Sequence, residues 1–287
     1  MRMREALRAV RVPDLKKKKE RGEKIAVLTA YDATMAGLFD RAGIDVLLVG
    51  DSLGTVILGY DSTVPVTLDD MLHHTAAVCR GSKRALVVAD MPFLSYQVSI
   101  PEALRNASRL IQKGSAAAVK MEGAGPVIPV TKALSEVGIP VMGHLGLTPQ
   151  AVHALGGYRS QARDQASASQ LIEDAHALEE AGAVGLFLEA IPDEVARQVT
   201  TLLNIPTIGI GAGPYCDGQV LVSYDAFGIF DKFTPSFVRH YASLGDTLVS
   251  ATRSYIDDVK NGHFPEPRGS SPATATPKRM DLVEKES

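Results

Sequence analysis

Ionisable side chains follow five short apolar runs at regular intervals along this chain. Runs of this kind are typical of strands that are buried on both faces in a parallel sheet. The carboxyl ends of parallel strands meet at one edge, where α/β proteins place their active sites. Carboxylates gathered there repel one another unless a cation or a proton lies among them. The pattern therefore predicts a charged site formed by Asp51, Asp90, Glu122, His144 and Glu189.

Three of these residues are candidate metal ligands. Asp51, Asp90 and Glu122 offer oxygen and no thiolate, a set that suits a hard divalent cation, with Mg²⁺ as the leading candidate. His144 is either a further ligand or a hydrogen-bond donor to a substrate. Glu189 follows Glu122 by two strands, and as a carboxylate without a metal it is the predicted general base.

Lys120 precedes Glu122 by two positions on the same predicted strand, so both side chains point to the same side of the sheet. A buried lysine needs an anionic partner, and a substrate carboxylate or phosphate would serve. The alternative is that both side chains lie on the outer face under helices, where they would be poorly satisfied.

The apolar runs alternate with amphipathic segments typical of helices. Extended segments are predicted over 25–29, 45–49, 85–89, 117–121, 140–143, 184–188, 206–210 and, more weakly, 226–230. Helices are predicted over 13–22, 33–42, 67–80, 101–113, 125–137, 166–181, 193–202 and 236–261, with a loop over 145–165. Eight strands in this alternation predict a closed (β/α)₈ TIM barrel with an N-terminal helix. A doubly wound sheet is the rival, and polar residues at most strand ends favour the barrel.

The barrel is predicted to be a single catalytic domain over residues 1–264. Residues 265–287 are rich in proline, serine and threonine, and we expect a disordered tail there. The lysine run at 16–19 is predicted to be a solvated face of the first helix.

Composition excludes several classes of partner. Charged residues make up 22% of the chain with a net charge of −3, so no field would gather nucleic acid or an anionic membrane. No apolar run reaches the ~18 residues of a membrane span. The two cysteines form no zinc pattern, and the N-terminus has no secretory signal. We therefore expect a cytoplasmic enzyme with small-molecule substrates.

Three other functions fit parts of the sequence. Gly50–Gly54 satisfies G-x-S-x-G, which would make Ser52 a hydrolase nucleophile, but a predicted extended lid follows in place of the required helix. A binding or scaffold protein would not need carboxylates at successive strand ends. A magnesium-dependent carbon–carbon lyase or mutase of the phosphoenolpyruvate mutase/isocitrate lyase type needs the same ligands and stays open.

Seven motifs in order give the chain a family resemblance. They are V-G-D-S-L-G, Y-D-S-T-V-P-V-T, A-D-M-P-F, V-K-M-E-G, G-H-L-G-L-T-P-Q, F-L-E-A-I-P and I-G-I-G-A-G. From about Pro13 to about Phe264 the chain resembles the 3-methyl-2-oxobutanoate hydroxymethyltransferases, also called ketopantoate hydroxymethyltransferases.

The resemblance implies a magnesium-dependent (β/α)₈ homodecamer of pantothenate and coenzyme A synthesis. It would transfer the one-carbon unit of 5,10-methylenetetrahydrofolate to 3-methyl-2-oxobutanoate through a metal-stabilised enolate, giving 2-dehydropantoate. By the same resemblance, Asp51 and Asp90 would bind Mg²⁺ directly and Glu122 through water, and the two aspartates would also contact the substrate. Ser52 and Lys120 would hold the oxoacid beside His144, and Glu189 would be the base.

Two positions depart from the family pattern. Ser236 stands where the family often has a basic residue, and Ala162 follows Gln161 where it often has glycine. We expect these departures to affect a loop over the site and the last helix rather than the reaction.

Overall fold

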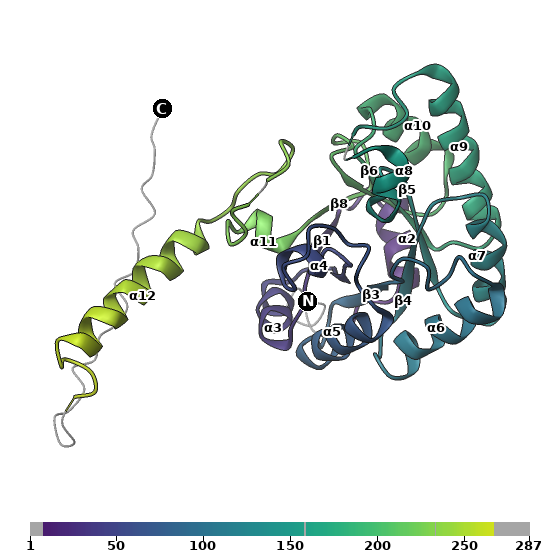
Figure 1. The fold of residues 1–287 in the computed structure, drawn as a ribbon. Coiled ribbons are helices and arrows are strands. Elements are labelled where there is room, and N and C mark those ends of the chain that lie inside the picture. The colour runs from purple at the N-terminus through teal and green to yellow at the C-terminus, as the bar shows by residue number, and fades with distance from the viewer. Residues whose placement is uncertain (1–7, 158, 233, 267–287) are drawn as a thin grey trace.

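Eight parallel strands form a closed barrel in the computed structural model, which describes residues 8–157, 159–232 and 234–266 (Figure 1). Each strand pairs with the next one in sequence, and the last pairs with the first. The strands are β1 (Ile25–Thr29), β2 (Val46–Val49), β3 (Leu86–Asp90), β4 (Ala118–Glu122), β5 (Val141–Gly146), β6 (Gly185–Glu189), β7 (Thr207–Ile210) and β8 (Gly218–Leu221). The predicted (β/α)₈ barrel is confirmed.

The strands read as apolar runs because both of their faces are covered. Every residue of β2, β3 and β4 is buried, including the charged residues that end β3 and β4. Side chains in the barrel interior cover one face of each strand, and the surrounding helices cover the other, as expected of a parallel barrel. The strand register sets Asp90 beside Lys120, and Glu122 beside His144, at one mouth of the barrel.

Helices surround the strands, and local signals fix several of their ends (Figure 1). Asp32 caps the helix after β1 by accepting from the backbone N–H of Thr34 and Met35, and Gly43 ends that helix with φ 93°. The helices are α2 (Val12–Glu20), α3 (Ala33–Ala42), α4 (Leu53–Val56), α5 (Leu68–Gly81), α6 (Ile100–Gln112), α7 (Val127–Glu136), the 3₁₀ turn η1 (Pro149–Ala151), α8 (Val152–Leu155), α9 (Gln165–Glu180), α10 (Asp193–Leu202), α11 (Ser223–Ala226) and α12 (Leu244–Lys260).

The N-terminal helix α2 lies against the amino ends of the strands. Its Leu15 is fully buried in a cluster with barrel residues such as Ile25 and Phe187. Lys19 Nζ lies 2.8 Å from Asp217 Oδ2, and Lys18 Nζ lies 3.1 Å from Asp45. The prediction that the lysine run is a solvated face is therefore wrong for these two residues, because they pair with carboxylates beside the first and last strands.

Three predicted segments are corrected by the structure. The eighth strand is Gly218–Leu221, whereas residues 226–230 begin at the end of α11 and turn at Gly228, where φ is 60°. The last helix starts at Leu244 and not near residue 236. The segment after Ser52 is not an extended lid from its start, because Leu53–Val56 forms one helical turn.

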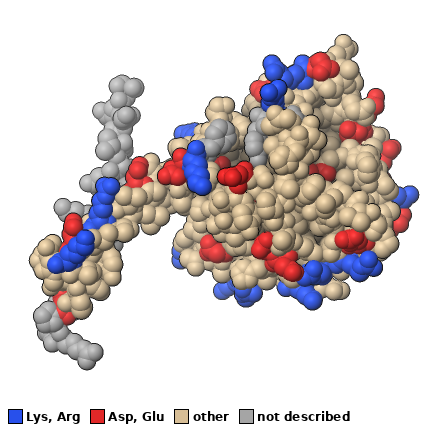
Figure 2. Space-filling view, in the orientation of Figure 1, with Lys and Arg blue, Asp and Glu red and all other residues tan. Residues whose placement is uncertain are grey.

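Helix α12 projects away from the barrel and buries none of its residues (Figures 1 and 2). It still carries apolar side chains, and Leu248 is 58% exposed. Only the one-turn helix α11 follows β8 before this projection, so the β1–β8 side of the barrel lacks the helix that covers other strands. A groove lined by residues that include Ala26, Gln219 and Tyr241 lies there.

The face of the molecule drawn in Figure 2 carries no large patch of one charge sign. Figure 2 shows acidic and basic side chains interspersed over the face in view. None of the described helices is long and apolar enough to cross a bilayer. The predicted tail at 265–287 lies almost wholly outside the described residues.

Candidate active site

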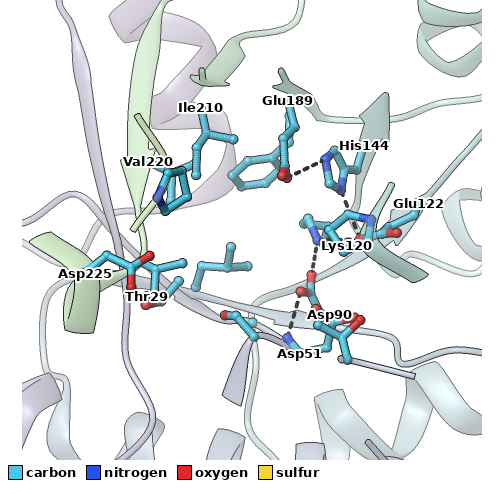
Figure 3. Close-up of a pocket in the computed structure, with 18 of the residues that line it drawn as sticks. Thr29, Asp51, Asp90, Lys120, Glu122, His144, Glu189, Ile210, Val220 and Asp225 are labelled. Atoms are coloured by element: carbon cyan, nitrogen blue, oxygen red, sulfur yellow. Dashed lines mark hydrogen bonds and ion pairs between the residues drawn. The ribbon is translucent and has the colours of Figure 1, made fainter. Parts of the chain in front are cut away.

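All seven residues predicted for the site line one pocket at the carboxyl ends of the strands (Figure 3). They come from β2 to β6 and the turn after β2, which explains how side chains far apart in sequence converge. The residues are Asp51, Ser52, Asp90, Lys120, Glu122, His144 and Glu189. The predicted convergence is confirmed; the chemical role of each residue stays a prediction.

Lys120 lies at the centre of the acidic residues. Its Nζ donates to Asp90 Oδ1 at 2.6 Å and lies 3.9 Å from Glu122 Oε1. Although burial lowers the pKa of Lys120, the charges of Asp90, Glu122 and Asp51 raise it above its ordinary value. The ammonium therefore stays charged and can attract an anion into the pocket. The alternative that Lys120 and Glu122 lie on the outer face of the barrel is wrong.

His144 lies between two carboxylates. Its Nδ1 is 3.2 Å from Glu122 Oε1 and its Nε2 is 3.3 Å from Glu189 Oε2, at ion-pair rather than aligned hydrogen-bond geometry. Burial and Lys120 lower the pKa of His144, but the two glutamates raise it to about 9. Burial raises the pKa of Glu122, yet His144 and Lys120 lower it below its ordinary value. At neutral pH an imidazolium thus holds both glutamates in position.

Asp51 is the acidic residue least compensated by nearby positive charge. Burial and then the charges of Asp90 and Glu122 raise its pKa well above the ordinary value, and Lys120 offsets only part of this effect. Oε1 of Glu122 is also buried without a hydrogen bond from the described residues. Carboxylates that crowd in this way are stabilised by a cation among them, and their oxygens suit a hard divalent ion. The donor set therefore fits Mg²⁺.

The acidic residues are not already arranged as a metal cage. Within the described ranges, no group of three or more histidine, cysteine, aspartate or glutamate side chains is arranged to hold a metal ion. Asp90 and Glu122 contact Lys120 and His144, and Asp90 also accepts from the Asp51 backbone N–H. Asp51 is the described carboxylate of this group without an ion pair, so binding of a cation by Asp90 would require its contact with Lys120 to loosen.

Gln150, for which the sequence predicted no role, holds two of the acidic side chains in place. Its amide nitrogen donates to Asp51 Oδ2 at 2.9 Å and to the Met91 carbonyl at 3.0 Å, and its backbone N–H donates to Glu122 Oε2 at 3.0 Å. Tyr96 donates its hydroxyl hydrogen to Gln150 Oε1 at 2.8 Å. Gln150 ends the motif G-H-L-G-L-T-P-Q, yet nothing in the letters shows that this loop folds back over the carboxylates.

Ser52 has a partner that does not activate it. Its Oγ lies 2.8 Å from the Tyr31 hydroxyl, and burial raises the pKa of Tyr31 above its ordinary value. Among the described residues no histidine or carboxylate hydrogen-bonds Ser52 Oγ. A nucleophilic serine needs such a base, so the helix after Ser52 does not restore the hydrolase alternative.

Glu189 is the most accessible of the acidic side chains in the ring of charges. Its side chain is 18% exposed, against 3% for those of Asp90 and Glu122. In the described part of the chain only its Oε2 is engaged, by His144, which leaves Oε1 available to a ligand. The next residue, Ala190, has φ 49°, so the backbone turns sharply where Glu189 ends its strand.

The other half of the pocket is mostly apolar. It is lined by Thr29, Ile210, Val220, Val222, Asp225, Pro235, Phe237 and Val238. Asp225 lies across the cavity from the charged half of the pocket (Figure 3). The charged half is formed by Asp51, Asp90, Lys120, Glu122, His144 and Glu189. Asp225 was not among the predicted site residues, because it follows β8, for which residues 226–230 were predicted in place of Gly218–Leu221.

A comparison of the sequence with protein families identifies the family of this chain. Residues 9–267 match the model of the family described as ketopantoate hydroxymethyltransferase. The chain belongs to this family. It is 56% identical to the 3-methyl-2-oxobutanoate hydroxymethyltransferase of Moorella thermoacetica over 90% of this chain and 96% of that protein. It is 57% identical to the enzyme of the same name from Caldicellulosiruptor bescii, over 86% and 94%. It is therefore a transferase enzyme, as predicted.

Solved structures of more distant proteins share the fold. A 2,3-dimethylmalate lyase of the phosphoenolpyruvate mutase/isocitrate lyase superfamily aligns with a TM-score of 0.58 at 18% identity, over 91% of both chains. A phosphonopyruvate hydrolase in complex with oxalate and Mg²⁺ aligns with a TM-score of 0.60 at 13% identity, over 92% of both chains. These likenesses concern the barrel architecture alone.

The structure explains one departure from the family pattern. Ala162 has φ 53°, a left-handed conformation that glycine adopts without steric cost. Ser236 lies between Pro235 and Phe237, both of which line the pocket. Neither departure touches the charged half of the site.

Proposed function

We propose that this protein transfers a hydroxymethyl group from 5,10-methylenetetrahydrofolate to 3-methyl-2-oxobutanoate with Mg²⁺ as cofactor, giving 2-dehydropantoate. The proposal rests on two groups that lie in one pocket of a chain of the hydroxymethyltransferase family. One is the charged Lys120, and the other is the accessible Glu189, which His144 holds in place. An oxoacid needs the first group for its charge and the second for its C3 proton.

The charged half would bind the oxoacid. Lys120 would attract its carboxylate while Ser52 donates a hydrogen bond, with His144 alongside. Asp51 and Asp90 would hold Mg²⁺ directly and also contact the substrate, and Glu122 would act through water. When bound, the metal would supply Lewis-acid polarisation of the 2-oxo group.

Glu189 would act as the general base. Its Oε1 would remove the C3 proton of the oxoacid while Oε2 stays against His144. The imidazolium fixes the carboxylate and limits its rotation away from the substrate. The resulting C3 carbanion would form a carbon–carbon bond to the folate methylene carbon. Both bonds from that carbon to folate nitrogens would break, one water molecule would supply the oxygen of the new hydroxyl group, and the folate nitrogens would take up the protons as tetrahydrofolate leaves.

Proton NMR of 3-methyl-2-oxobutanoate in D₂O tests the first half of this reaction. With enzyme and Mg²⁺ but no folate, the C3 proton signal should disappear, and chelation of the metal should stop the exchange. If exchange is absent, the measurement is repeated with tetrahydrofolate. No exchange in its presence either would contradict the proposed base and substrate.

The lyase or mutase alternative gains nothing beyond a shared fold from the solved structures. Its products would form from a carboxylic acid without any folate. Formation of 2-dehydropantoate that depends on 5,10-methylenetetrahydrofolate, with no cleavage of 2,3-dimethylmalate, would decide in favour of the transferase.

We also propose a cytoplasmic homo-oligomer. Cys79 and Cys216 are free thiols, in keeping with a reducing compartment. The apolar side chains of α12 and the groove beside β1 and β8 support docking with a second copy of the chain. The number of ten copies rests on the family resemblance alone. Light scattering of Leu248→Glu should give a smaller assembly than wild type, and an unchanged mass would contradict this docking.

A further inference from the structure

The carboxylate of Asp225 is buried without a hydrogen-bond partner among the described residues. The residue is 7% exposed, its Oδ1 is inaccessible to solvent, and no described residue hydrogen-bonds its side chain. Burial raises its pKa to about 6, with His240 acting in the opposite direction. The group is therefore ionised at neutral pH at a free-energy cost, and buried groups of this kind call for an explanation.

Local structure does not account for this residue. Asp225 lies within the short helix α11, whose first residues have no side-chain cap. The Ser223 backbone N–H donates to Thr29 Oγ1, and the backbone N–H groups of Phe227 and Gly228 are satisfied by carbonyl oxygens. The turn thus keeps its hydrogen bonds without any contribution from the Asp225 carboxylate.

The surroundings of Asp225 are mostly apolar. Asp225 lies opposite the charged side chains and on the same side of the cavity as Val220 (Figure 3). Val222 and Phe237 also line this pocket. Lys120, the lysine among the described pocket residues, already forms an ion pair with Asp90 and does not neutralise Asp225. A metal ion is disfavoured because Asp225 is the one carboxylate on this side among the described pocket residues.

We propose that Asp225 binds the adjacent N–H donors of the pterin ring of the folate co-substrate. A carboxylate accepts two parallel N–H groups from an amidine-like edge, and the 2-amino-pyrimidinone edge of a pterin presents such a pair. The apolar wall would contact the ring faces. This assignment rests on the proposed transferase function and extends it by naming the folate subsite.

Calorimetric titration with tetrahydrofolate under reducing conditions tests the assignment. Asp225→Asn should weaken binding by about 10- to 100-fold, because an amide cannot accept both donors with charge. The matched control is Asp231→Asn, an exposed carboxylate later in the same segment, which should bind as wild type does. The metal-dependent C3 exchange of the oxoacid should be unchanged in Asp231→Asn, which does not line the pocket.

A change in the ligand provides a second arm that does not depend on how the variant folds. A 2-desamino analogue of tetrahydrofolate should bind wild type about 10-fold or more weakly than tetrahydrofolate does, and Asp225→Asn should discriminate less between the two. Equal tetrahydrofolate affinity in wild type and Asp225→Asn would overturn the assignment while leaving the transferase intact. Failure of wild type to bind tetrahydrofolate at all, with or without oxoacid, would overturn both.

Discussion

The two halves of the pocket differ in how far their charges are balanced before any ligand binds. On the β2–β6 side, Lys120 and His144 contact Asp90, Glu122 and Glu189. On the β7, β8 and β1 side, apolar residues surround Asp225, which has no described hydrogen-bond partner. The charged half is therefore largely preorganised, whereas the Asp225 carboxylate in the apolar half would gain its hydrogen-bond partner from a ligand.

Glu189→Gln should break the chemistry of the charged half with the largest effect. An amide cannot accept the C3 proton, so turnover should fall by about 10²- to 10⁴-fold. Oxoacid binding should persist because Lys120 and Ser52 are unchanged. Steady-state kinetics and D₂O exchange measure the effect, with the exposed Glu194→Gln as control. Wild-type turnover would remove Glu189 from the mechanism.

Lys120→Met should break the charge balance itself. It leaves Asp90 buried without its cation, and removal of one partner from a buried pair costs about 3–5 kcal/mol of unfolding free energy. Urea denaturation in the absence of added metal measures this loss. Lys132→Met, at an exposed position of α7, should change stability little. Equal losses in the two variants would mean that the ion pair is not what matters.

Gln150→Leu should loosen the charged half without changing its charge. Asp51 loses the hydrogen bond from the side-chain amide, whereas Glu122 keeps the one from the backbone N–H of residue 150. Binding of Mn²⁺ as a magnetic probe should therefore weaken by about 1–3 kcal/mol. Electron paramagnetic resonance of free Mn²⁺ gives the affinity. Tyr96→Phe removes only the hydroxyl that supports Gln150, and it should have a smaller effect of the same sign. Unaltered Mn²⁺ affinity in Gln150→Leu would refute the positioning role.

In the apolar half, Asp225→Asn should raise the unfolding free energy of the ligand-free protein by about 1–2 kcal/mol. Burial raises the pKa of Asp225 in the folded chain to about 6, above its ordinary value of 3.8, so ionisation disfavours folding. The gain should be fully present above pH 6 and should vanish as the pH falls toward 4. Thermal unfolding at several pH values measures it. A destabilised variant at pH 7 would show that the carboxylate is satisfied.

Much of the site was predictable because strand ends carry a clear signal. Buried runs that stop at Asp51, Asp90 or Glu122 fix both the strand and its mouth-facing residue, and the parallel order then brings them together. The charge contacts of His144 could not be predicted, because they depend on the stagger of β5 against β4 and β6.

The errors cluster where the sequence pattern is weakest. The eighth strand is short and begins with Gly218 and Gln219, so it lacks the apolar run that marks the others. Residues 226–230 are more apolar, but Gly228 turns there. Gln150 and Asp225 act through loops and turns whose path depends on tertiary contacts, and no spacing rule reveals them. Nor does an amphipathic pattern tell whether a helix such as α12 packs on its own barrel.

The pairing of β1 with β8 also has a consequence for biosynthesis. During synthesis β1 can pair with β2 early, but it pairs with β8 only after β8 has been made. At roughly 5–20 residues per second, the roughly 190 residues between Ile25 and Gly218 take about 10–40 s to emerge from the ribosome. The strands that carry Asp51 through Glu189 are complete before then. For that interval β1 presents an open edge, and the newborn chain is exposed to wrong pairing until its final strand arrives.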